Sequence, residues 1–392
     1  MKRFGWILVV LMMASPAWAA KKVTVQQLKD LLISLQQAKK TDAEVSIALK
    51  QIELSEELTQ GTMNSLLDYI SGPLGTEQIY ALEAKSAMLA PPPSDLPSTP
   101  APDAATQKAI LDKAADYASK TYAQLPQLTA TKTTVRFQDS MDVIKASSGM
   151  HSSATSNDAP SLAMTPQFFH LISSTEKPIE FANGAEKADA GKDKGQWGMN
   201  GQIVLFGQSP VLSTVLQEAQ AAGKINFLRW ETVNGKTAAV YAFSVDKKKT
   251  HYEVNYCCFP DLDQTGRMSY SGPTQGNMNP VAHGNMQFTT FWHNFKTTVP
   301  YHGEIFVNPE TGIIIRLVTQ AEFKNTDVVH QEDQRIDYGP VTVGAKILVL
   351  PMQTFVNTEV VPNGDTGAGK YSTRHTLFIA EYKGYQPVGA AH

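Results

Sequence analysis

Residues 224–245 read KINFLRWETVNGKTAAVYAFSV and have the pattern of a β-hairpin. Two strand-like runs, 224–233 and 236–245, are joined by Asn234-Gly235. Asn-Gly is a preferred two-residue turn of a β-hairpin, because both turn positions need a positive φ. The stretch therefore predicts two antiparallel strands.

Similar runs recur on both sides of this hairpin, and a second turn at 308–312 joins two of them. One helix near 210–222 interrupts the strands: Ser209 can cap it, Pro210 suits its first position, and Gly223 ends it. The helix must bury an apolar stripe that includes Leu212 and Leu216. We expect an α+β fold, in which a helical module precedes a curved, half-barrel-like antiparallel sheet wrapped around this helix. The expected strands are 131–138, 177–181, 201–206, 224–233, 236–245, 251–259, 301–307, 313–323, 329–338, 345–358 and 376–382.

The chain before this sheet has the pattern of helices. Thr24 with Gln27 and Thr41 with Glu44 are capping-box pairs, and the second precedes an apolar stripe that runs to Ile52. The predicted organisation is a helical module at 21–89, a proline-rich linker at 90–103, the β-rich domain at 104–387 and a polar tail at 388–392. Two interpretations of the helical stripes stay open: they pack within the protein, or they dock a protein partner.

Residues 1–20 have the pattern of a cleavable signal peptide. Lys2 and Arg3 precede a short apolar stretch, and Ala17-Trp18-Ala19 follows as a cleavage pattern. No cysteine follows to accept a lipid, and no later stretch is long and apolar enough to be a transmembrane helix. We expect a periplasmic or secreted protein. The net charge of −3 gives no general reason to bind nucleic acid.

The two cysteines, Cys257 and Cys258, are adjacent. In an oxidising compartment three states stay open: a vicinal disulfide, a bridge to another molecule, or two thiols kept reduced by burial. Alternation along a strand would point one thiol at the core, which favours a packing role.

Several segments together resemble a family of uncharacterised exported proteins from acidobacteria. They are DAEV at 42–45, HYEVNYCC at 251–258, YHGEI at 301–305, NPETGIIIRL at 308–317 and DYGPV at 337–341. The 309–312 hairpin is also similar to one in periplasmic lipoprotein carriers of the LolA type and their LolB-type receptors. This second resemblance implies a half-barrel closed by helices around an apolar cavity for acyl chains.

Catalytic and metal motifs are incomplete. The glycine-rich segment 364–370 is followed by Tyr371, where a phosphate-binding loop needs Ser or Thr. Asp261 and Asp263 begin like a calcium loop that lacks its bidentate glutamate. His283, His293 and Glu304 could supply metal ligands, but not at the spacing of a known zinc site. We predict neither catalysis nor a cofactor.

Four aromatic residues gather before the strand that begins at 301: Phe288, Phe291, Trp292 and Phe295. In a loop-like region they would form a lid over an apolar cavity or pack on the core. The favoured hypothesis is an envelope protein that binds an apolar or lipid-like ligand between sheet and helix, without catalysis. The alternative is a structural or interaction protein with a solidly packed sheet, whose helical module docks a partner.

Overall fold

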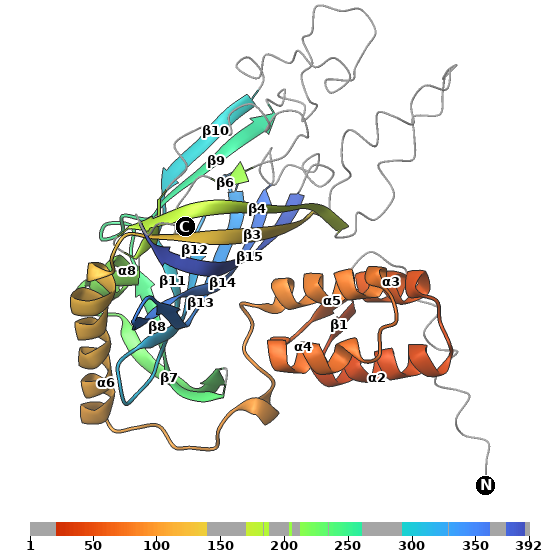
Figure 1. The fold of residues 1–392 in the computed structure, drawn as a ribbon, viewed down its shortest axis with the longest axis horizontal. Coiled ribbons are helices and arrows are strands. Elements are labelled where there is room, and N and C mark those ends of the chain that lie inside the picture. The colour runs from red at the N-terminus through yellow and green to blue at the C-terminus, as the bar shows by residue number, and fades with distance from the viewer. Residues whose placement is uncertain are drawn as a thin grey trace, which may run out of the picture.

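The computed structural model describes residues 21–138, 170–182, 184–187, 204–205, 212–233, 235–260, 292–327, 329–360 and 374–388. The expected signal peptide and the glycine-rich segment 364–370 lie outside these ranges. Within them the chain forms a helical module and a large antiparallel sheet, so the predicted α+β class is confirmed (Figure 1).

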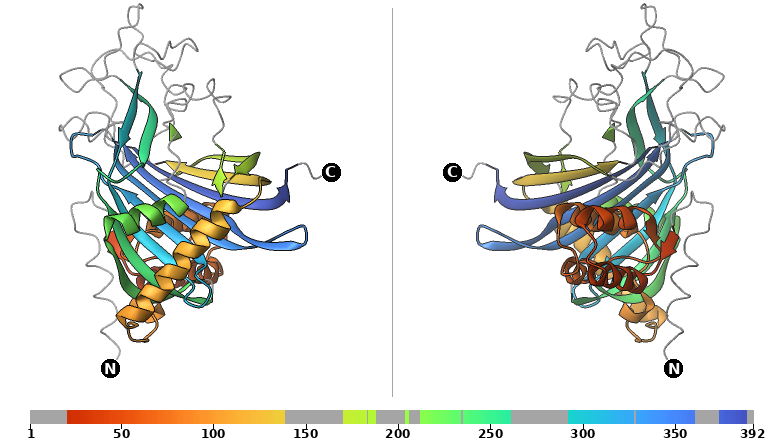
Figure 2. Two further views of the ribbon diagram at one scale, coloured as in Figure 1. Left: turned by 90° about the vertical axis from the view of Figure 1, so that its left-hand side faces the viewer. Right: turned by 90° about the vertical axis from the view of Figure 1, so that its right-hand side faces the viewer.

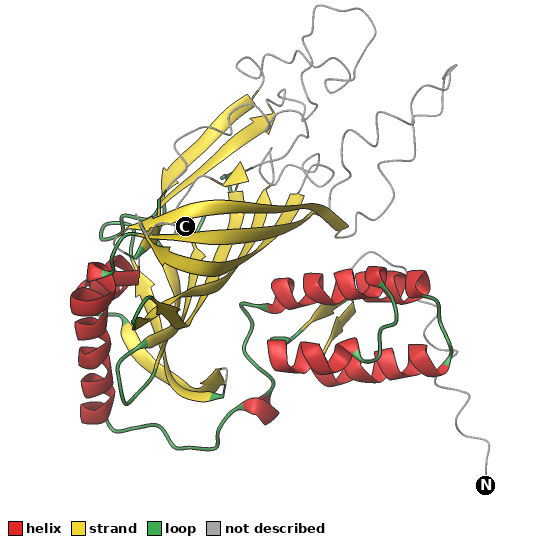
Figure 3. Cartoon of the chain, viewed as in Figure 1, coloured by secondary structure: helices red, strands yellow, loops and turns green. Residues whose placement is uncertain are grey.

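The helical module contains four α-helices and two short strands (Figure 3). Both predicted capping boxes are present, because Thr24 and Thr41 each accept a hydrogen bond from the backbone three residues later. The two strands pair in parallel, and Ile52, which was expected to end the second helical stripe, belongs to the second strand. The elements are β1 (Lys21–Val23), α2 (Val25–Gln37), α3 (Asp42–Lys50), β2 (Ile52–Leu54), α4 (Gln60–Leu67) and α5 (Pro73–Ser86).

The apolar stripes of these helices pack on one another. Leu28, Leu32, Leu49, Leu66 and Ile79 are at most 1% exposed and belong to one cluster. The module therefore has its own core. The apolar stripes pack within the protein, which is the first of the two interpretations given above.

A linker connects the module to the next helix. It contains a single 3-10 turn, Pro93–Asp95, and leads to Asp103, whose carboxylate accepts a hydrogen bond from Thr106 N at 2.7 Å. Asp103 is the N-cap of α6 (Ala104–Asp116), which continues through a π-helical turn, Tyr117–Thr121, and a 3-10 turn, Tyr122–Gln124. The linker also contacts the sheet, because Trp230 Nε1 donates to the carbonyl oxygen of Pro100 at 2.8 Å.

Ten antiparallel strands form the main sheet in the order β5-β4-β3-β15-β14-β13-β12-β11-β8-β7. They are β3 (Leu128–Gln138), β4 (His170–Ala182), β5 (Ala185–Glu186), β7 (Ile225–Val233), β8 (Lys236–Val245), β11 (Tyr301–Val307), β12 (Ile314–Ala321), β13 (Val329–Val343), β14 (Lys346–Val360) and β15 (Arg374–Pro387). A smaller sheet has the order β10-β9-β6, from β6 (Val204–Leu205), β9 (Glu253–Pro260) and β10 (Trp292–Thr298).

One face of the main sheet, here called the α8 face, packs against α6 and α8 (Leu212–Ala222). Leu212, Val215, Leu216 and Ala219 of α8 are at most 2% exposed, in one cluster with Ile110 and Ala114 of α6 and with aromatic residues of β8 and β11. The helix predicted at 210–222 does bury its stripe on the sheet. Helix α6 shares the same core.

The opposite face, here called the module face, packs against α5. Ala81, Ala84 and Ala87 form a cluster with Phe355 and Leu377 of the sheet. The sheet thus lies between the helical module on one face and α6 with α8 on the other, as the two views of Figure 2 show. Within the described part of the chain, every helix falls short of the length and apolar character needed to cross a membrane.

The turn predicted at 308–312 joins β11 to β12 and is built from local hydrogen bonds. Asn308 Oδ1 accepts from the backbone of Glu310 and Thr311, both at 3.0 Å. Gly312 has a φ of +75° and lies against Lys113 of α6, whose Nζ donates to the carbonyl oxygen of Glu310 at 3.1 Å. The turn therefore also fastens α6 to the sheet.

Candidate functional site

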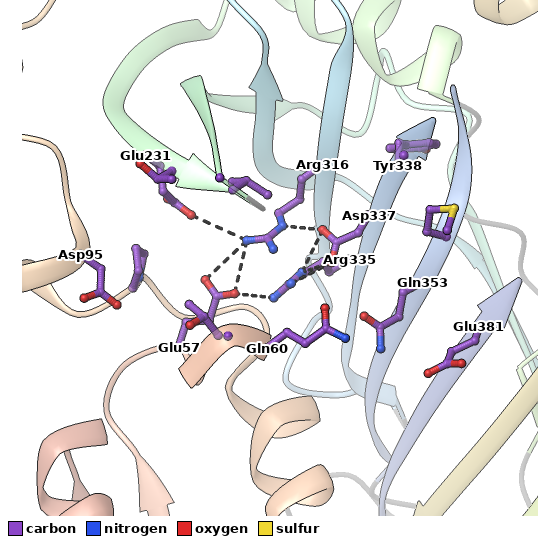
Figure 4. Close-up of a pocket in the computed structure, with 18 of the residues that line it drawn as sticks. Glu57, Gln60, Asp95, Glu231, Arg316, Arg335, Asp337, Tyr338, Gln353 and Glu381 are labelled. Atoms are coloured by element: carbon purple, nitrogen blue, oxygen red, sulfur yellow. Dashed lines mark hydrogen bonds and ion pairs between the residues drawn. The ribbon is translucent and has the colours of Figure 1, made fainter. Parts of the chain in front are cut away.

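A cleft of about 860 Å³ lies between the helical module and the module face of the sheet. The module and linker line it with Glu57, Thr59, Gln60, Gly61, Pro91 and Asp95. The sheet lines it with residues of β7, the β7–β8 turn, β12, β13, β14 and β15. This module–sheet cleft is mainly polar at its floor, where charged side chains from both bodies meet (Figure 4).

Arg316 reaches the floor through an irregularity in β12. Phe306 of β11 pairs with Arg316 and Val307 pairs with Ile314, so Ile315 is an extra residue in the ladder. Such a bulge redirects neighbouring side chains. The guanidinium lies over the ring of Phe306, 5.3 Å from its centroid, and Arg316 is 6% exposed.

Arg335 and Asp337 reach the same floor by simple alternation along β13, which sends residues two apart to one face. The guanidinium of Arg335 lies 5.0 Å from the centroid of the Phe355 ring. Arg335 and Asp337 are 5% and 6% exposed. A bulge follows directly, because Asp337 pairs with Gln353 and Tyr338 pairs with Pro351.

Asp337 bridges the two arginines. Its Oδ1 lies 2.5 Å from Arg316 Nε, and its Oδ2 lies 2.7 Å from Arg335 Nη2. Burial by itself would raise the pKa of Asp337, but the two guanidinium charges lower it to about 2. Asp337 is therefore a fixed negative charge at neutral pH.

Glu57 supplies a second bridging carboxylate, from the other body. Its Oε1 lies 2.6 Å from Arg335 Nη1 and 3.3 Å from Arg316 Nη1. Glu57 is 2% exposed and belongs to the segment between β2 and α4. Its backbone N–H donates to the carbonyl oxygen of Ala90 at 2.8 Å, which holds this segment beside the start of the linker.

Two further buried glutamates surround this group. Glu231 lies 2.8 Å from Arg229 Nη2 and 3.7 Å from Arg316 Nη1, and burial raises its pKa against the pull of both arginines. Glu83 of α5 is 4% exposed, and burial raises its pKa to about 7 against the charge of Arg335. The floor therefore holds more carboxyl groups than the arginines neutralise, and protonation of Glu83 relieves the excess.

The walls above the floor offer unused polar groups. The side-chain amides of Gln60, from the module, and Gln353, from β14, form no hydrogen bond with a described residue. Nη2 of Arg316 likewise donates to no described residue. An amide both donates and accepts, so the cleft can serve polar groups of either kind.

A second polar group lies under the α8 face. Tyr252 Oη donates to Glu332 Oε1 at 2.8 Å, and burial raises the pKa of Glu332 to about 8. Among the described residues, Glu332 Oε2 and the buried atoms His330 Nε2 and Gln334 Oε1 have no hydrogen-bond partner. Glu332 and Gln334 alternate along β13 and share one face of the sheet, and a bulge at His330 interrupts the alternation just before them.

Three of the six residues proposed for an apolar site have described side chains: Leu212, Leu216 and Phe295. Leu212 and Leu216 are packed core residues, 2% exposed. Phe295 packs against Phe323, with ring centroids 6.2 Å apart. The expected loop at 292–298 is strand β10, which contains Trp292, while Phe288 and Phe291 lie outside the described residues.

Glu304 is the one proposed metal ligand whose side chain is described. Glu304 is paired with Arg229, with Oε1 3.0 Å from Nη1 and Oε2 2.8 Å from Nη2. His293 lies in β10, and His283, Asp261 and Asp263 fall outside the described ranges. No three His, Cys, Asp or Glu side chains among the described residues are placed to hold a metal ion. Cys257 and Cys258 both lie in β9, as expected from the strand pattern.

The interpretation of the sequence did not single out Glu57, Arg316, Arg335 or Asp337. One signal was available, because Arg316 stands inside the apolar run 313–318, and a charge in such a run must find a buried partner. No local pattern identifies the partner. No family model, curated protein or solved structure matches this chain.

Proposed function

We propose that this chain is an exported, non-catalytic binding protein of the cell envelope whose ligand site is the module–sheet cleft. The observation that carries the proposal is a cleft of about 860 Å³ lined by both bodies. Pockets for small ligands typically measure about 300–1,000 Å³ and often lie between domains. Export rests on the signal-peptide pattern of residues 1–20.

The floor and the wall amides favour a ligand with polar groups. Glu57, Asp337 and the two arginines form the floor, and Gln60 with Gln353 offers amides on the walls. A lipid tail would leave the two amides and Nη2 of Arg316 without water or partners, which costs free energy. The apolar-ligand hypothesis required open space beside Leu212 and Leu216, and those two side chains are packed against the sheet.

The charged groups of the floor are suited to binding rather than to proton transfer. Asp337, with its pKa near 2, is too weak a base for catalysis at neutral pH. Arg316 and Arg335 stay protonated and are held in fixed orientations by carboxylates on two sides. We assign no reaction to the cleft.

A side chain that fills the cleft tests the proposal. Gly61 lines the cleft, and an added Cβ would meet no atom within 4 Å, so Gly61→Trp can enter the space without disturbing the packing. Asn64→Trp is the matched control, because Asn64 is exposed on the same helix and does not line the cleft. Both proteins are screened by thermal shift against fractions of an envelope extract.

The proposal predicts a fraction that stabilises the wild type and Asn64→Trp but not Gly61→Trp. Equal stabilisation of all three proteins would move the binding site away from the cleft. Stabilisation only by lipid fractions, abolished by Leu216→Asp in a folded protein, would restore the apolar-ligand hypothesis.

A further inference from the structure

The two carboxylates that bridge Arg316 and Arg335 differ in origin. Asp337 stands two residues from Arg335 on the same strand, so the sheet itself fixes it against both guanidiniums. Glu57 is 259 residues from Arg316 and 278 residues from Arg335 in the sequence, and it belongs to the helical module. The sheet alone therefore presents two arginines oriented by one aspartate, with a position for one more carboxylate.

The charges of the floor also require a second anion. Arg316 and Arg335 carry two positive charges, and Asp337 supplies one negative charge within 2.7 Å. Glu231 is directed mainly at Arg229, at 2.8 Å against 3.7 Å for Arg316. An unpaired buried charge is costly, so the position that Glu57 occupies, in direct contact with both guanidiniums, favours a negative charge.

We propose that the Arg316–Arg335 pair is a carboxylate-binding subsite at the floor of the module–sheet cleft, which Glu57 occupies within the chain and a carboxylate-bearing ligand occupies in its place. The inference rests on the proposed binding function of the cleft. Replacement of one carboxylate by another leaves the charge of the floor unchanged, so the exchange needs no compensating proton or ion.

An incoming carboxylate can first bind to Arg316. This arginine lines the cleft, and its Nη2 carries two N–H groups that donate to no described residue. An incoming carboxylate can bind these groups while Nη1 still holds Glu57, and can then take the Arg335 side as Glu57 leaves. Guanidinium groups bind carboxylates in this two-point manner more strongly than lysine does.

The surroundings select a singly charged carboxylate over a phosphate dianion. Glu231, Asp337 and Glu83 all lie around the pair, and burial has already raised the pKa values of Glu231 and Glu83. A second negative charge at this position would be repelled by the same groups. The recognised chemistry is therefore a carboxylate, whether of a small acid or of a polypeptide terminus.

Removal of Glu57 tests the subsite without knowledge of the natural ligand. The full mature chain carrying Glu57→Ala is melted in sodium propionate and in sodium chloride at equal ionic strength. Propionate is expected to raise the Tm of Glu57→Ala by a few degrees relative to chloride, because it binds only the folded protein. The wild type is expected to show no such difference, because Glu57 is tethered at a high local concentration.

Two controls make the result specific. Glu231→Ala removes another carboxylate of the same cleft, and Arg335→Met in the Glu57→Ala background removes half of the subsite. Neither is expected to respond to propionate. A Tm of Glu57→Ala that is equal in the two salts, or an equal response of Glu231→Ala, would overturn the proposal.

Glycylglycine and glycylglycine amide distinguish the two sources of the carboxylate. A response to glycylglycine that exceeds the response to propionate and is absent with the amide indicates a polypeptide terminus, and the reverse order indicates a small acid. If Glu57→Ala does not fold in chloride, refolding in propionate becomes the measurement. Failure in both salts, while Glu57→Gln folds, would contradict the subsite. A cleft ligand excluded by Gly61→Trp in the absence of any propionate effect would retain the binding function and reject only the carboxylate.

Discussion

Glu57 Oε1 lies 2.6 Å from Arg335 Nη1, although 278 residues separate the two in the sequence. Both side chains are at most 5% exposed, and their ion pair joins the helical module to the centre of the sheet. The pair helps to orient the two bodies, because separating a buried ion pair without a replacement partner costs free energy.

This pairing predicts a large and non-additive loss of stability. Glu57→Gln and Arg335→Met should each lower the free energy of unfolding by about 3–5 kcal/mol, because each leaves buried charges unpaired. The double variant should lose less than the sum of the two. Urea denaturation of the wild type, the two single variants and the double variant gives the coupling free energy between the two residues. Additive losses would show that the two residues act independently.

The buried carboxyl of Glu83 predicts a loss of stability with rising pH. Its pKa is 4.5 in an unperturbed chain and about 7 in the fold, so between these values the folded protein holds a proton that the unfolded chain has released. The free energy of unfolding should therefore fall between about pH 4.5 and 7, by an amount on the order of 3 kcal/mol. Glu83→Gln should make the pH dependence of urea-derived stability shallower over this window, in which buried Glu332 contributes a slope of the same sign, and an unchanged slope would assign the effect to other groups.

The lowered pKa of Asp337 predicts the opposite pH dependence in acid: the free energy of unfolding should rise with pH. Its pKa is 3.8 in an unperturbed chain and about 2 in the fold, because the two arginines outweigh the cost of burial. The stabilisation is fully present above about pH 4 and is lost as the pH falls toward 2, with a size on the order of 2 kcal/mol. Asp337→Asn should remove this loss of stability between about pH 4 and 2. Acid titration monitored by circular dichroism tests it, and an identical acid midpoint in the variant would refute the assigned pKa.

Two glycines with nearly equal φ angles should lose different amounts of stability when they are replaced by alanine. Gly312 and Gly235 have φ values of +75° and +74°, so alanine strains both backbones alike. At Gly312 the new Cβ would lie 2.6 Å from the backbone of Lys113, whereas at Gly235 it would meet nothing within 4 Å. Gly235→Ala should cost about 1–2 kcal/mol, and Gly312→Ala should cost clearly more. Equal shifts in Tm would mean that α6 does not pack on this turn.

Local sequence patterns predicted much of the fold because they carry the necessary information. Asn234-Gly235 and the turn at 308–312 specify hairpins, and the capping boxes at Thr24 and Thr41 mark helix starts. Strand β10 was missed because the Asn- and Gly-rich sequence before it has the composition of a loop. The position of α6 beside α8 was missed because an amphipathic pattern does not say which element covers the stripe.

The candidate site was not predicted, for a related reason. Alternation along β13 places Arg335 and Asp337 on one face, but it does not show which face the helical module covers. The extra residue Ile315, which helps to direct Arg316 to that face, has no distinctive sequence pattern. Glu57 is one of 37 acidic residues, and its pairing depends on contacts between distant segments.

Native mass spectrometry of the mature protein, purified from its own envelope beside Gly61→Trp and Asn64→Trp, shows whether a ligand binds in the module–sheet cleft. We expect a polar adduct of constant mass on the wild type and on Asn64→Trp, and bare Gly61→Trp that is folded by circular dichroism. The same adduct on Gly61→Trp, or an acyl-chain species bound equally to all three proteins, would contradict a binding site in the module–sheet cleft.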